Sequence, residues 1–391
     1  MNNMTFEQVS AVLNDIMEQV TGKSSIAPID TTDFVSVGQT ALKAGADPLA
    51  MGISQVLDRT IFSIRPYYAK FTAMMKTDRE FGAWTRKVNY IDSDFVDDAA
   101  YPIPDGQSVD HYVVRKPQVL QLNFYGQALV SDFITRFEDQ IKNAFRGPDE
   151  LGEFWTGALQ NLSDKHEQKT EAIARGNLVN AITGIVTANN TNQVVHLLTE
   201  YNAETGQSLT ATSVMAPANY EPFMKWVYAR IQTVRDMLTE RSIKYHLNVT
   251  GKEIMRHTPY DRHVLYMYAP ALRQMEARVL AGAFNEGRLQ YKDIELVNYW
   301  QSIDTPTQVQ GIPCYMGSDG ALVEGGSGDN VTVSNIFALL ADEEALGIRR
   351  YSEGMYSTPL NARGRYYDFW YHWRWQNYVD YTENMVVFTL D

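Results

Sequence analysis

The side chains that could bind a metal ion do not occur here in the patterns that metal sites require. The run 92–98 contains four aspartates, but it lacks the central Gly and the terminal bidentate Glu of a calcium loop. His257 and His263 are six residues apart, a spacing that does not place both imidazoles on one face of a helix. We therefore expect a solvated acidic turn, histidines with structural or surface roles, and no metal ion.

Signatures of nucleotide binding and of nucleophilic catalysis are also missing. Gly251-Lys252 has no upstream Gly at the spacing of a phosphate-binding loop, and no Gly-x-Ser-x-Gly elbow occurs. Cys314 is the one cysteine, so it cannot form a disulfide within the chain, and we interpret it as a small buried side chain in a reducing compartment. Carboxylates near Trp and Tyr leave a carbohydrate-active enzyme open as an alternative, but we expect no enzyme activity and no cofactor.

Composition favours a folded protein with extensive contacts over a nucleic-acid-binding protein. The 391 residues include 47 acidic and 34 basic side chains, which give a net charge of −13, so a basic groove for DNA or RNA is not expected. The 23 Tyr and 7 Trp bury large areas while keeping a polar atom, which indicates either subunit interfaces or an aromatic core. Neither a signal peptide nor a membrane-spanning apolar run is apparent.

Two long amphipathic helices are predicted from apolar residues at helical spacing. The first begins at Pro148, because Pro suits the first turn and the acids that follow suit the positive end of the helix dipole. It continues to about Ile185 unless Gly176 or Gly184 ends or bends it. The second covers 219–240. The other predicted helices are 5–20, 268–284 and one that opens at the capping-box pattern 250–253.

A long β-hairpin is the most distinctive predicted element. Residues 84–91 and 113–124 form its strands, and an acidic, Pro-containing tip connects them. A two-stranded flap is marginally stable alone, so it should lie on something else, such as a neighbouring subunit. Residues 21–48 similarly indicate an extended arm with little core of its own. Further strands are predicted at 245–249, 294–300, 336–340 and within 364–390, with a loop at 317–330, so the fold class is α+β.

The C-terminal strands contain the densest aromatic cluster of the chain. Between Tyr366 and Trp375 the rings are so frequent that we expect poor alternation between inward and outward positions. A stripe of this kind is typical either of a central strand covered on both faces or of a contact site. We predict that it forms core on one side and a subunit contact on the other.

A specific motif lies in the same region. Asn361-x-Arg363-Gly364-x-Tyr366 is followed by Tyr371-His372 and Trp375-Gln376, and the chain closes on the apolar Val386-Val387-Phe388. In these residues the sequence resembles the C-terminal end of major capsid proteins from the small, phi-twenty-nine-like podoviruses. Upstream, Ala283-Phe284-Asn285 and Ile294-Glu295-Leu296-Val297 are similar but less specific.

The resemblance implies the tailed-phage major capsid fold of the Hong Kong ninety-seven type, and the order of the predicted elements agrees with it. The implied parts are an N-terminal arm at 1–65, a hairpin loop region at 66–130, a peripheral lobe with a spine helix at 131–214, an axial lobe at 215–345, and C-terminal strands at 346–391 that rejoin the peripheral lobe.

The resemblance also implies a function. Family members form pentamers and hexamers of an icosahedral shell around double-stranded DNA, with a separate scaffolding protein, a portal protein and no membrane, first in the host bacterial cytoplasm and then in the virion. A nanocompartment shell protein of the same fold is the main alternative. The candidate subunit contacts are Trp84, Tyr90, Asp97, Tyr101, Tyr112, Arg363, Tyr371 and Trp375.

Overall fold

A computed structural model describes most of the chain. The described residues are 70–76, 85–91, 103–108, 112, 114, 116–125, 128–140, 148–275, 294–326, 328–351 and 354–391, and for 148–161 and 275 only the backbone is described. The predicted helix at 5–20 and the predicted arm lie outside these residues.

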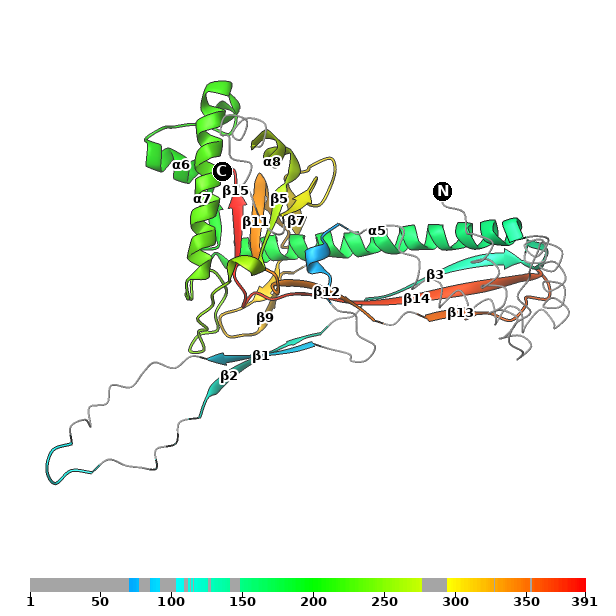
Figure 1. Ribbon diagram of the computed structural model, residues 1–391, viewed down its shortest axis with the longest axis horizontal. Coiled ribbons are helices and arrows are strands. Elements are labelled where there is room, and N and C mark those ends of the chain that lie inside the picture. The colour runs from blue at the N-terminus through cyan, green and yellow to red at the C-terminus, as the bar shows by residue number, and fades with distance from the viewer. Residues whose placement is uncertain are drawn as a thin grey trace.

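A single long helix organises the molecule. Helix α5 runs unbroken from Pro148 to Ala188 over 41 residues, so the predicted helix is confirmed and neither Gly176 nor Gly184 ends it. Figure 1 shows α5 lying along one side of an elongated lobe and ending in a more compact lobe that stands across it. The described residues also form the helices α6 (Leu197–Thr205), α7 (Pro217–Thr239) and α8 (Ala269–Met275). No helix among the described residues is long and apolar enough to cross a membrane.

The compact lobe is built on a five-stranded sheet with the order β4–β15–β11–β5–β6. Helix α7 covers one face, where Phe223 and Val227 share a core with Leu340 of β11. The end of α5 covers the other face, where Ile182 packs in one core with Leu339. Because both faces of this sheet are covered, its central strands are apolar at nearly every position. The strands are β4 (Val194–His196), β5 (His263–Tyr268), β6 (Ile294–Val297), β11 (Ile336–Asp342) and β15 (Met385–Thr389).

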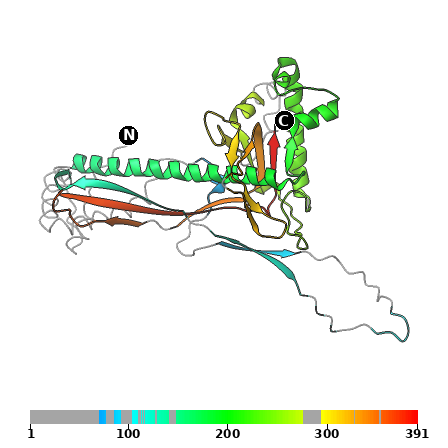
Figure 2. The ribbon, with the colours of Figure 1, turned by 180° about the vertical axis from the view of Figure 1, so that it is seen from behind.

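The elongated lobe consists of α5 and a second sheet centred on β14. In this sheet β14 (Tyr366–Val379) pairs with β3 (Ala128–Phe137) on one side and with β12 (Leu346–Arg350) and β13 (Gly354–Ser357) on the other. The view from behind also shows α5 and the long strands side by side (Figure 2). Five odd-numbered positions of β14 point into the core beneath α5: Tyr367, Phe369, Tyr371, Trp373 and Trp375.

The expectation of poor alternation in this segment was wrong. Buried and half-buried positions alternate from Tyr366 to Trp375, as expected for a strand. The sequence does not reveal this period of two, because aromatic residues occur on both faces of the strand. Strand β14 joins the long sheet, whereas β15 pairs with β11 in the compact lobe.

The predicted hairpin is present. Strands β1 (Thr85–Ile91) and β2 (Gln118–Phe124) pair antiparallel along their full length, and in Figure 1 they lie below the long sheet. The second strand begins later than predicted, at Gln118. Short strands complete the fold: β7 (Val309–Gly311) with β10 (Val331–Val333), and β8 (Cys314–Met316) with β9 (Leu322–Glu324). The part of the chain that the structure describes also contains the 3₁₀ turns η1 (Thr72–Met74), η2 (Ser213–Met215) and η3 (Tyr260–Arg262).

Other local predictions had mixed outcomes. The helix at 219–240 and the strands at 294–300 and 336–340 are confirmed as α7, β6 and β11. No strand forms at 245–249 and no helix opens at 250–253. Gly251 has a φ of 74° there, and Glu253 accepts a hydrogen bond from the Gly251 N–H at 3.0 Å, so the capping-box residues form a tight turn. The predicted loop at 317–330 contains β9.

Candidate assembly surfaces

The β1–β2 hairpin has one face toward the body of the subunit and one toward solvent. On the inner face, Leu120 packs with Val249 and Ile254 in a small apolar cluster that attaches the hairpin to the body. On the outer face, Tyr90 lies directly opposite Val119, and the Tyr90 side chain is 71% exposed. An apolar cross-strand pair this exposed is suited to a contact with another chain.

The long sheet also has an outer face with exposed rings. Phe133 of β3, Trp370 of β14 and Tyr356 of β13 are direct neighbours in register and form a row across three strands. The Phe133 and Trp370 rings stack with their centroids 4.7 Å apart. The Phe133 side chain is 49% exposed and the Tyr356 side chain 64%. Large exposed apolar patches are uncommon on monomeric proteins, so this row is a candidate contact site.

Further side chains extend this aromatic row along the sheet. Phe137 meets Tyr366 edge to face at 6.1 Å, and His372 lies 5.6 Å from Tyr356 between ring centroids. Leu129 precedes Phe133 by four residues on β3, so it lies on the same face of the strand, and it is also exposed. We call these seven side chains the aromatic face: Leu129, Phe133, Phe137, Tyr356, Tyr366, Trp370 and His372.

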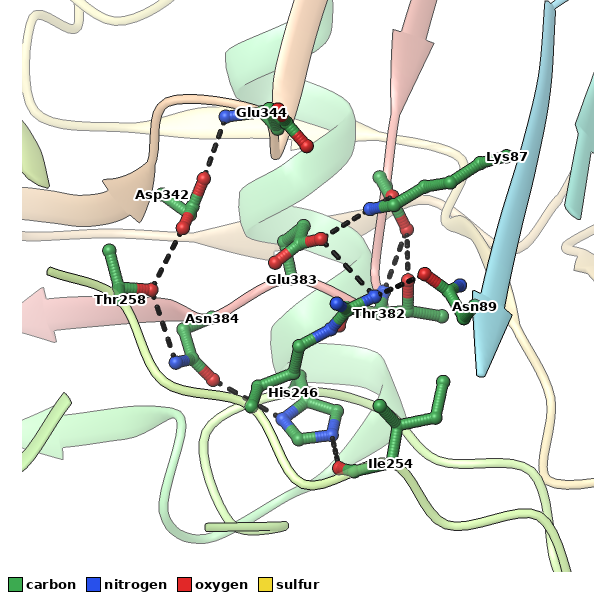
Figure 3. Close-up of polar contacts among 12 residues, drawn as sticks. Lys87, Asn89, His246, Ile254, Thr258, Asp342, Glu344, Thr382, Glu383 and Asn384 are labelled. Atoms are coloured by element: carbon green, nitrogen blue, oxygen red, sulfur yellow. Dashed lines mark hydrogen bonds and ion pairs between the residues drawn. The ribbon is translucent and has the colours of Figure 1, made fainter. Parts of the chain in front are cut away.

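A cluster of charges joins the hairpin to the turn between β14 and β15. The Lys87 ammonium of β1 contacts the Glu383 carboxylate (Figure 3). It also contacts the Asp380 carboxylate. Arg256 lies 3.2 Å from Glu383 and donates to the Asn89 side-chain oxygen at 2.6 Å. Burial alone lowers the pKa of Lys87, but the two carboxylates outweigh burial and raise it above its ordinary value, so Lys87 is charged at neutral pH.

A neutral contact lies at the root of the hairpin. The buried Gln376 side chain of β14 binds both strands, because its oxygen accepts from the Thr85 hydroxyl at 2.8 Å and its nitrogen donates to the Phe124 carbonyl at 2.7 Å. Tyr351 also donates to the Gln376 oxygen at 3.1 Å. The hairpin therefore starts from a fixed point in the long sheet.

Behind the charge cluster lies a buried histidine. His246 Nδ1 is 3.2 Å from the Asn384 side-chain oxygen, and its Nε2 is 2.8 Å from the Ile254 carbonyl oxygen (Figure 3). Burial lowers the pKa of His246, so the ring is neutral at physiological pH. The network connects the loop that carries Arg256 to the β14–β15 turn, and it has the character of core structure.

Comparison with known proteins identifies the family. A family model described as the Phi29-like phage major capsid protein matches residues 113–389, more than half of the chain. The chain belongs to the Phi29-like phage major capsid protein family. This capsid protein is therefore a structural protein of the phage head that self-associates into a shell, and the nanocompartment and carbohydrate-active enzyme alternatives are not favoured.

Solved structures show the same fold at low identity. A chain of the capsid structure of Staphylococcus phage Andhra is 12% identical with a TM-score of 0.55, covering 84% of this chain and 86% of that one. A chain of the structure of the head fiber and inner core protein of native bacteriophage P68 is 13% identical with a TM-score of 0.52 and the same coverage. A search of curated proteins finds no significant match. The capsid protein has the Hong Kong ninety-seven type of fold.

The candidate contact residues divide into three groups. Tyr90, Tyr112 and Arg363 are exposed and stay candidates. Tyr371 and Trp375 are corrected: both are buried inside the capsid protein's own core, because the odd positions of β14 face α5, so their side chains cannot contact a neighbour. The remaining three lie outside the described residues: Trp84, Asp97 and Tyr101.

Sequence reasoning missed the centre of the aromatic face. Phe133 and Tyr356 were not singled out, and Trp370 was placed in the aromatic stripe without being assigned to the core or to the contact side. The available signal was the period of two along β14, which separates Trp370 from Tyr371 once the strand is placed. The pairing with β3 could not be found from local sequence, because Phe133 and Trp370 are far apart in the chain.

Chemical sites do not emerge from the described residues. No group of three or more metal-ligating side chains occurs among them. A cleft of about 710 Å³ lies between β1 and the body, and its charged lining includes Lys87, Arg256 and Glu383, which already pair with one another or with Asp380.

Proposed function

We propose that copies of this capsid protein form pentamers and hexamers of an icosahedral shell that encloses double-stranded DNA. The observation that carries the proposal is the row Phe133–Trp370–Tyr356, an exposed apolar surface on a protein of a shell-forming family. The outer side of the hairpin, with Tyr90 and Val119, supplies a second apolar surface elsewhere on the subunit. Two different surfaces suit a head-to-tail contact, which closes into a ring when the rotation between neighbours allows it.

The lobes take corresponding roles in the proposal. The elongated lobe, with α5 as spine helix, is the peripheral lobe, and the compact lobe is the axial lobe. The hairpin overlies a neighbouring subunit, and the arm at 1–65 reaches across. We assign β15 and the segment with β4 and α6 to the axial lobe, because β15 and β4 belong to its five-stranded sheet.

The partners of the shell follow from the same proposal. A separate scaffolding protein guides assembly in the bacterial cytoplasm, a portal protein occupies one vertex, and the packaged DNA is enclosed without sequence-specific binding. The net charge of −13 supports the last point, because an acidic wall does not adhere to a polyanion. The protein acts structurally and catalyses no reaction.

Sedimentation velocity with negative-stain imaging tests the proposal. We expect the purified protein, alone or with the phage's scaffolding protein, to form shells, tubes or capsomer rings. Phe133→Ser should abolish these fast species while lowering the unfolding midpoint only modestly, because the side chain is 49% exposed in the subunit and loses there mainly its stacking on Trp370. Phe133→Tyr keeps the stacked ring and should still assemble. Unchanged assembly by Phe133→Ser would show that the aromatic face is not a contact, and failure of the wild type with its scaffold would contradict the shell.

A further inference from the structure

We propose that Lys87, Arg256, Asp380 and Glu383 form a releasable latch that holds the hairpin against the subunit, and that Gln376 is the pivot about which the hairpin turns when the latch opens. The latch and the pivot are separate sets of contacts. The latch is charged and lies along the inner face of β1, whereas the pivot is neutral and lies at the hairpin root.

The body half of the latch is held in place by contacts within the body. One oxygen of Asp380 accepts from the Thr382 N–H at 2.9 Å and from the Thr382 hydroxyl at 2.6 Å, while Lys87 contacts the other oxygen. Glu383 keeps Arg256 at 3.2 Å, and Arg256 also donates to the Thr382 carbonyl at 3.0 Å. When Lys87 leaves, Glu383 keeps Arg256, whereas the buried Asp380 keeps only its hydrogen bonds from Thr382. Opening therefore leaves the Asp380 charge without a cation, which favours the closed position until water reaches the carboxylate.

The hairpin half favours release for two reasons. The Lys87 side chain is 19% exposed at its position beside the carboxylates, so its ammonium reaches water by a small movement. The Asn89 side-chain nitrogen is buried and has no hydrogen-bond partner among the described residues, although the oxygen of the same amide accepts from Arg256. A buried donor without a partner destabilises the closed position, and opening lets water satisfy it.

The pivot is built to stay closed. Gln376 is fully buried, and its amide binds Thr85 of β1 and Phe124 of β2 at once. The oxygen of this amide also accepts from Tyr351, which anchors it to the long sheet. The first residues of the hairpin therefore keep their place when the contacts further along β1 are lost.

The latch gives the hairpin two positions. If the shell proposed above is correct, identical subunits must meet at different angles in pentamers and hexamers, and a hairpin with a fixed root and a separable latch can follow that difference. This consequence rests on the proposed function, whereas the latch itself is a property of the single subunit.

Distances between spin labels on the unassembled full-length protein test the latch. One label is placed at the far end of the hairpin by Gln107→Cys and the other on α7 by Ala229→Cys, with Cys314→Ser removing the native thiol. Dilution with unlabelled protein removes distances between subunits. Lys87→Met removes the ion pairs of the hairpin with Asp380 and Glu383. Lys165→Met is the matched control, because it breaks a lysine–aspartate pair with Asp132 away from the hairpin.

We expect one dominant distance in the wild type and in Lys165→Met, and a second, displaced population in Lys87→Met. The opening constant should rise about ten- to a hundredfold, the effect of losing a hydrogen bond to a charged group. Lys87→Arg retains the charge and should restore the wild-type distribution. An unchanged distribution in Lys87→Met would overturn the latch.

Hydrogen exchange on the wild type gives an independent measurement should Lys87→Met fail to fold. Amides of β1 and β2 should exchange through a local opening that leaves β14 protected. Exchange of the hairpin only together with β14 would refute the latch. Because both measurements use the unassembled subunit, a failure of assembly would count against the proposed shell and leave the latch standing.

Discussion

Two glycines of α5 give opposite predictions for the same substitution. Gly176→Ala adds a methyl group that meets no atom within 4 Å, so only the backbone preference changes. Replacing a glycine inside a helix by alanine stabilises by about 0.5–1 kcal/mol, since the unfolded chain loses conformational freedom. We expect the free energy of unfolding to rise by that amount.

Gly184→Ala places the methyl group against the Tyr381 ring, 2.8 Å from Cζ and 3.0 Å from Cε1. The ring is held, because the Tyr381 hydroxyl is 2.8 Å from both the Asn180 and the Cys314 carbonyl oxygens. Overpacking costs about 1–3 kcal/mol, and a lost hydrogen bond about 0.5–1.5 kcal/mol. After the helix preference is subtracted, the net loss is about 1–3 kcal/mol.

Denaturant unfolding of the unassembled protein measures both variants at one protein concentration. A difference of about 2–4 kcal/mol between the two variants is expected, with similar slopes. Tyr381→Phe in the Gly184→Ala background should recover part of the loss, because it removes the nearest clashing atom. Equal stabilisation by both substitutions would refute the packing of Tyr381 against α5.

Two further predictions concern the core and its pH dependence. Trp375→Ala should lower the free energy of unfolding by about 3–5 kcal/mol, as expected for a fully buried ring. Trp375→Phe should cost far less, because the indole N–H has no hydrogen-bond partner among the described residues. Equal losses for the two variants in denaturant unfolding would contradict this expectation. Burial lowers the pKa of His246 and His263 below the ordinary value of 6.5, so their contribution to stability is complete above that pH and is lost as pH falls toward the lowered pKa values. Unfolding midpoints should therefore drop between about pH 7.5 and pH 5.5, less steeply in His246→Gln, and a midpoint that does not change with pH would contradict the buried neutral rings.

The helices and the central strands could be predicted from sequence because their signals are local. In α7, buried Phe223, Val227, Ile231 and Val234 recur at helical spacing, and β11 is a continuous apolar run. The hairpin strands were also recognisable from composition. The turn at Gly251 was mistaken for a helix start, because a capping-box pattern does not specify the φ of the residues between its two ends, and Gly251 has a positive φ.

The surfaces that matter for assembly depend on contacts between distant segments. Lys87 meets Asp380 and Glu383, and Phe133 meets Trp370, only after β1 and β3 have joined strands near the C-terminus. Composition gave a surplus of aromatic residues but could not assign each ring to core or surface. That assignment requires the register of β14, which places Tyr371 and Trp375 inside and Trp370 outside.

The most direct test of the account is a cryo-EM structure of the assembled shell. We predict that the aromatic face, with Phe133, Tyr356 and Trp370 at its centre, and the outer side of the hairpin at Tyr90 are both covered by neighbouring subunits. A shell in which these rings stay exposed to solvent would contradict the proposed contacts.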